Sequence, residues 1–132
     1  MMTYFLLGLG SNIKPQQNLP AAIAAVEEIG NLVDVSPAVI TAPVGDTFHH
    51  EFGNQLLILS CQLPAPMLKH KLQIIEESMG REPKSPARKT RDRTIDIDIL
   101  GEAQSAVEAR ALVPDESYYA EVYANWNQPE KV

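Results

Sequence analysis

Two aspartates alternate with isoleucines in the segment RDRTIDIDIL, residues 91–100. The alternation of apolar and polar residues is the period-two pattern of a β-strand with one buried face. Asp96 and Asp98 then point the same way, with Cα atoms about 6.6 Å apart. Two carboxylates this close repel each other and raise one another's pKa unless a cation lies between them. The pattern therefore favours a metal site, with a solvated strand face as the alternative.

A basic segment leads directly into these aspartates. Residues 81–93, REPKSPARKTRDR, hold six of the eleven Lys and Arg residues of a chain whose net charge is −6. Guanidinium groups suit phosphate oxygens because they donate two parallel hydrogen bonds. A compact basic patch in an acidic protein indicates a local anionic ligand, whereas the alternative is a solvated charged loop.

Length and composition narrow the class of protein. The chain has 132 residues, 45% hydrophobic and 21% charged, so we expect a single domain over 1–132 with a short C-terminal tail. No apolar run reaches the roughly 18 residues of a membrane span, and no signal peptide is recognisable. The single cysteine, Cys61, indicates a reducing cytoplasm. The net charge argues against nucleic-acid partners, and the oligomeric state is open, with a monomer slightly favoured.

Apolar periodicity divides the chain into six main elements. Strands are predicted at 3–10, 31–43, 54–63 and 94–100, and helices at 15–29 and 65–80. Pro37 weakens the second strand, which indicates an edge or a bulge. We expect the glycines of GLGSN, residues 8–12, to permit a tight strand exit and close approach of neighbouring backbone. No Gly-Lys-Ser/Thr follows them, so this is not a Walker P-loop.

The order β-α-β-β-α-β predicts an α+β fold with a ferredoxin-like core and an antiparallel sheet. Two connections, 43–53 and 81–92, are longer than the fold needs, and we expect both to be active-site loops beside the aspartates. For the tail after Gly101, the sequence predicts only short, irregular segments.

Five fragments carry a resemblance to a known family. GLGSN, TAPVG followed by FGNQ, IEESMGR and RTIDIDIL stand in this order. Over roughly residues 3–114 the chain resembles the hydroxymethyl-dihydropterin pyrophosphokinases of folate biosynthesis. The resemblance implies transfer of a pyrophosphoryl group from ATP, as co-substrate, to the pterin hydroxymethyl group, with release of AMP and participation of two Mg²⁺ ions.

The resemblance also implies roles for individual residues. Asp96 and Asp98 match the family's metal ligands, and Arg81 and Arg93 match positions that contact ATP phosphates during catalysis. Nucleotide binding is further implied for residues of the second helix and the basic segment: Gln73, Glu76 and Arg88. Gln73 and Glu76 are expected to share the polar side of that helix. Pterin binding is implied for five residues: Thr41, Pro43, Val44, Phe52 and Asn54.

The pterin residues suit their implied ligand. A flat heteroaromatic ring needs an aromatic side chain for stacking and an amide for its polar edge. Phe52 and Asn54 supply these two groups. Without the resemblance, Phe52 would be read as a core residue and Asn54 as the start of a strand.

The chain departs from the family pattern in its last third. A tryptophan and Gly-Pro before Arg93 are missing, Asp115 stands where the family has histidine, and the later Arg-x-Phe element is absent. Four aromatic residues of the tail are candidates to replace what is lost: Tyr118, Tyr119, Tyr123 and Trp126. Two alternatives to an active enzyme stay open, namely a weak or inactive paralogue that binds a pterin or nucleotide, and a ferredoxin-like interaction domain.

Overall fold

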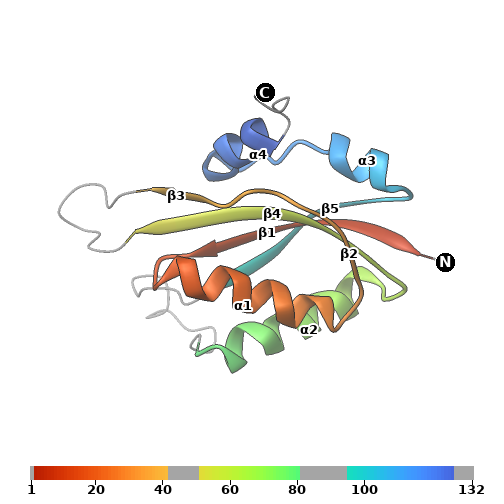
Figure 1. The fold of residues 1–132 in the computed structure, drawn as a ribbon. Coiled ribbons are helices and arrows are strands. Elements are labelled where there is room, and N and C mark those ends of the chain that lie inside the picture. Colours follow the sequence, from red (N-terminus) through yellow and green to blue (C-terminus); the bar gives the residue numbers. More distant parts are fainter. Residues whose placement is uncertain (1, 42–50, 81–94, 127–132) are drawn as a thin grey trace.

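A five-stranded antiparallel sheet forms the centre of the protein, as seen in a computed structural model that describes residues 2–41, 51–80 and 95–126 (Figure 1). The strands are β1 (Thr3–Ser11), β2 (Asn31–Val35), β3 (Val39–Thr41), β4 (Phe52–Cys61) and β5 (Asp96–Ala103). Their order is β2-β4-β1-β5, and β3 also pairs with β4. Each crossover therefore skips one strand, which is the split arrangement of ferredoxin-like folds. The predicted fold class is confirmed.

Pro37 divides the second predicted strand into β2 and β3. Both pieces pair with β4, so this strand is an edge strand, as predicted. Between them, the Ser36 hydroxyl accepts the Leu56 N–H at 2.9 Å, and the Gln55 amide donates to the Ser36 carbonyl at 2.7 Å. Side chains thus replace the ladder bonds that a proline interrupts.

Two helices cover one face of the sheet: α1 (Pro15–Glu27) and α2 (Ala65–Ser78). Their buried residues, among them Leu19, Leu68 and Leu72, pack on Leu57 and Leu59 of β4. These are the apolar stripes that the helical periodicity predicts. Figure 1 shows both helices on the same side of the sheet.

The tail covers the opposite face and is more regular than predicted. It forms α3 (Ala106–Ala111), the 3₁₀ turn η2 (Ser117–Tyr119) and α4 (Ala120–Trp126). Ala109, Tyr119 and Val122 pack there against Leu6 and Leu56 of the sheet. The prediction of irregular pieces was wrong because segments this short show no clear periodicity. The result is three layers, with the sheet between two helical layers (Figure 1).

Arg110 fastens the tail to the edge of the sheet. Its Nε lies 3.0 Å from Asp34 Oδ2 of β2, and its guanidinium carbon lies 3.7 Å from the centre of the Trp126 ring. Its Nη2 also donates to the Trp126 carbonyl at 3.3 Å. One planar side chain therefore connects α3, β2 and the end of α4.

No helix among the described residues combines the length and apolar character needed to cross a bilayer.

Candidate active site

Asp96 and Asp98 lie on β5, an edge strand of the sheet. Ile95 and Ile97 belong to the core beneath α1 and α2, so the alternating aspartates point to the opposite face. Both are half-buried. The strand predicted from the sequence therefore holds two carboxylates side by side on the face that the tail covers.

Two glycines of β1 stand directly across from these aspartates. Gly10 pairs with Asp96, and Gly8 pairs with Asp98. The strand continues through both glycines to Ser11, so the predicted tight strand exit at the glycines was wrong. Glycine inside a strand marks a place where other atoms approach closely.

The approaching atoms belong to two polar side chains. A Cβ at Gly10 would lie 3.2 Å from Asn54 Oδ1, and a Cβ at Gly8 would lie 2.5 Å from the Tyr119 hydroxyl oxygen. Because Gly10 also pairs with Asn54 of β4, Asp96, Gly10 and Asn54 form one row across the sheet. Tyr119 of η2 stands over the next row, at Gly8 and Asp98.

Tyr119, one of four tail aromatics named as candidate replacements, has a position at the site that the sequence did not predict. It is 1% exposed, and burial raises the pKa of its hydroxyl, with the charge of Asp98 as the next cause. The hydroxyl is thus protonated and uncharged at neutral pH. In the sequence, Gly8 was the available signal for this contact. A glycine within an apolar strand indicates that another side chain approaches the strand there, but it does not identify that side chain.

Glu76 of α2 supports β5 from the other face. Its Oε2 accepts the Ile97 N–H at 2.7 Å, and the residue is 6% exposed. The expectation that Gln73 and Glu76 share the polar side of the helix is therefore wrong for Glu76, whereas Gln73 is exposed. This hydrogen bond from a buried side chain holds the backbone of β5 between the two aspartates in place.

The predicted pterin residues meet at the β3–β4 pair. Thr41 pairs with Phe52, and its Oγ1 donates to the Phe52 carbonyl at 3.5 Å. Asn54 lies two residues further along β4, so Phe52 and Asn54 share a face. The structure brings together Thr41, Phe52, Asn54, Asp96 and Asp98 at one end of the sheet.

The remaining predicted site residues lie outside the described part of the chain: Pro43, Val44, Arg81, Arg88 and Arg93. Asp115 is described and exposed, and it precedes η2.

The donor set at the aspartates fits Mg²⁺. Magnesium binds few carboxylates and completes its shell with water and substrate phosphates. Asp96 and Asp98 present carboxylate oxygens on one face, opposite two residues without side chains. Within residues 2–41, 51–80 and 95–126, no group of three or more His, Cys, Asp or Glu side chains gathers, which excludes a zinc-type ligand cluster from those residues.

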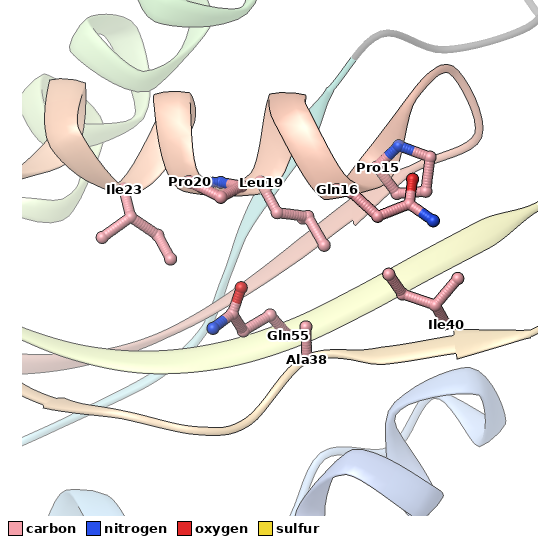
Figure 2. Close-up of a pocket in the computed structure, with 8 residues that line it drawn as sticks. All are labelled: Pro15, Gln16, Leu19, Pro20, Ile23, Ala38, Ile40 and Gln55. Atoms are coloured by element: carbon pink, nitrogen blue, oxygen red, sulfur yellow. The ribbon is translucent and has the colours of Figure 1, made fainter.

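A separate pocket of about 310 Å³ lies between α1 and the β3–β4 edge. Figure 2 shows Leu19 and Ile23 of α1 above Ile40 and Gln55 of the strands. Gln55 lies on the face toward α1, because it alternates with Asn54 and Leu56. The pocket contains none of the predicted site residues.

Comparison with known proteins identifies relatives. A family model described as 7,8-dihydro-6-hydroxymethylpterin-pyrophosphokinase matches residues 6–125. A 2-amino-4-hydroxy-6-hydroxymethyldihydropteridine pyrophosphokinase of Porphyromonas gingivalis is 35% identical over 101 residues, which cover 75% of this chain and 69% of the relative. The protein of the same name from Pseudomonas aeruginosa is 35% identical over 108 residues, 76% of this chain and 62% of the relative.

Proposed function

This chain belongs to the 7,8-dihydro-6-hydroxymethylpterin-pyrophosphokinase family, and we propose from that membership that it transfers a pyrophosphoryl group from ATP to 6-hydroxymethyl-7,8-dihydropterin in folate biosynthesis. The new bond joins the pterin hydroxymethyl oxygen to the β-phosphorus. The bond between the β-phosphorus and the oxygen that leaves with AMP breaks, and the hydroxyl proton is lost. The observation that carries the proposal is the family match over residues 6–125.

We propose Asp96 and Asp98 as the ligands of two Mg²⁺ ions that accompany ATP. Their side chains share a face and a half-buried setting. When bound, such ions offset the triphosphate charge and polarise the β-phosphorus. Glu76 contributes indirectly, since its bond to the Ile97 N–H keeps the intervening backbone in place.

The pterin is proposed to bind at the β3–β4 end of the same face. Phe52 offers an aromatic surface for the ring, and Asn54 offers an amide for its polar edge. Asn54 lies in the same cross-strand row as Asp96. A pterin held by Asn54 would therefore bring its hydroxymethyl group toward the metal ligands, which is the positioning that group transfer requires.

The nucleotide is proposed to be held by basic and polar side chains of α2 and of the segment that leads into β5. Arg81, Arg88 and Arg93 flank or lie in the segment that leads into β5, and guanidinium groups suit phosphates. On the basis of the family resemblance, Gln73 is retained as a nucleotide position, and Pro43 and Val44 as pterin positions. Glu76, which was assigned with Gln73, instead supports β5 from its buried position.

We also propose that residues 1–132 work as one domain in the cytoplasm, with the pterin and ATP as partners and no nucleic acid or membrane. The support is the acidic net charge and a buried, free Cys61.

The test is an assay of AMP release with ATP, Mg²⁺ and 6-hydroxymethyl-7,8-dihydropterin. We expect AMP in equal amount to pyrophosphorylated pterin, and neither product without Mg²⁺. Calorimetry with a non-hydrolysable ATP analogue provides the control for folding and binding. Binding of pterin and analogue without any AMP release would overturn the proposed activity and favour a binding-only paralogue.

A further inference from the structure

Tyr119 places its hydroxyl on the sheet instead of in solvent. The residue is 1% exposed, and the end of its ring occupies the space above Gly8. A Cβ built there would lie 2.4 Å from Cζ and 2.5 Å from the hydroxyl oxygen. Real Cβ atoms do not approach other atoms so closely, so only glycine at this position admits the ring.

The sheet register puts Asp98 next to that hydroxyl. Gly8 and Asp98 are directly paired, and the Cβ positions of such pairs are about 4.5–5.5 Å apart. Since the hydroxyl lies 2.5 Å from the Gly8 Cβ position, a carboxylate extending from the Asp98 Cβ is within its reach. Asn54 has the corresponding place over Gly10, beside Asp96.

We propose that Tyr119 is a positioning residue of the metal site: when the cation binds, its hydroxyl donates a hydrogen bond to the Asp98 carboxylate and holds that carboxylate in the orientation that receives the cation. The inference rests on the proposed function, in that it takes Asp98 as a metal ligand. A second-layer hydrogen bond of this kind orients a ligating carboxylate and strengthens metal binding.

Packing alone does not account for a tyrosine here. Phenylalanine would fill the same space among Leu6, Leu56 and Val122 without burying a hydroxyl, which is costly unless it is hydrogen-bonded. The Asp98 carboxylate is the charged group that the register places beside the hydroxyl.

The experiment compares Tyr119→Phe with Tyr4→Phe by calorimetric titration with Mn²⁺, used as a probe for the Mg²⁺ site, in the presence of an ATP analogue. Tyr4 lies on the same strand face but pairs with Ala103 at the other end of β1. We expect Tyr119→Phe to raise the Kd for Mn²⁺ by about three- to tenfold, and Tyr4→Phe to leave it unchanged. Thermal unfolding without metal checks that both variants fold.

The double variant Asp98→Asn/Tyr119→Phe distinguishes an effect of Tyr119 on Mn²⁺ affinity that acts through Asp98 from an effect that is independent of Asp98. If Tyr119 acts through Asp98, its substitution has no further effect on Mn²⁺ affinity once Asp98 is changed. Wild-type affinity in Tyr119→Phe, or an equal additional loss in the double variant, would overturn the inference. Failure of the wild type to release AMP while it binds Mn²⁺ would instead overturn the proposed function, and the Tyr119 comparison would still decide the inference.

Discussion

The two faces of the sheet are built from the same strands but serve different purposes. Toward α1 and α2, β1 presents Phe5, Leu7 and Leu9, which are fully buried among aliphatic side chains. Toward the tail, the alternating positions beyond Leu6 are Gly8 and Gly10. Because side chains alternate along a strand, a single stretch of β1 completes the core on one face and leaves room for polar groups on the other.

The difference shows how a buried site can be formed without weakening the core. Asp96 and Asp98 lie opposite glycines, and the aliphatic core continues unbroken behind them through Ile95 and Ile97. We therefore expect substitutions on the tail face to alter metal binding and those on the helical face to alter stability.

The largest effect is expected for Asp96→Ala and Asp98→Ala. Loss of a proposed metal ligand should lower AMP release by at least about a hundredfold, because a metal bound there would supply several kcal/mol of transition-state stabilisation. For Asp96→Ala the metal-free thermal midpoint should stay equal or rise slightly, since one of two repelling charges is gone and no buried hydroxyl loses its neighbour. Unfolding of these variants, or AMP release at the wild-type rate, would contradict the assignment of metal binding to the tail face and of stability to the helical face.

On the helical face, Leu57→Ala should cost about 2–5 kcal/mol in the free energy of unfolding. Leu57 is fully buried beneath the helices, so its removal leaves a cavity. Urea denaturation measures the loss, and Val33→Ala, at a position 40% exposed, serves as the matched control. We expect the folded fraction to bind Mn²⁺ normally, and a matching loss of Mn²⁺ affinity would show that the faces are not independent.

Glu76 connects α2 on the helical face to the backbone between the two aspartates. Its substitutions therefore test whether stability and metal binding can be separated. Glu76→Ala leaves the Ile97 N–H without its acceptor, at a cost of about 1–3 kcal/mol, and should also weaken Mn²⁺ binding. Glu76→Gln keeps an acceptor oxygen and should retain most of the stability. Equal losses in the two variants, measured by urea denaturation and Mn²⁺ titration, would mean that the charge matters rather than the hydrogen bond.

The smallest effect is expected for Arg110→Lys. Its ion pair with Asp34 is partly exposed, with side chains 28% and 42% accessible, and such pairs contribute little. Loss of the planar guanidinium stack on the Trp126 ring also lowers stability. Together, the two losses should lower the free energy of unfolding, measured by urea denaturation, by about 0.5–1 kcal/mol. AMP release should be unchanged, and a larger fall in activity than in stability would place Arg110 closer to the site than its contacts indicate.

The helical face and the two aspartates on the opposite face could be predicted from the sequence, whereas the way the tail covers that opposite face could not. Leu19, Leu68 and Leu72 recur at helical spacing, and Ile95 and Ile97 alternate, so local periodicity is enough to predict their burial. Tyr119 reaches Gly8 through a contact between distant parts of the chain, and the short helices around it carry little periodic signal. Glu76 was misjudged for a related reason, because its acceptor role depends on an N–H of β5.

Metal binding on the tail face can be tested directly by methyl NMR of the protein with an ATP analogue and Mn²⁺, whose paramagnetism broadens nearby signals. Leu56 and Leu57 are neighbours in β4, but Leu56 packs on the tail face and Leu57 beneath α1 and α2. Leu56 pairs with Gly8, one strand away from Asp98. We expect the methyl signals of Leu56 and Leu6 to broaden well before that of Leu57. Preferential broadening of Ile23 and Ile40, which line the pocket on the other face, would contradict metal binding on the tail face.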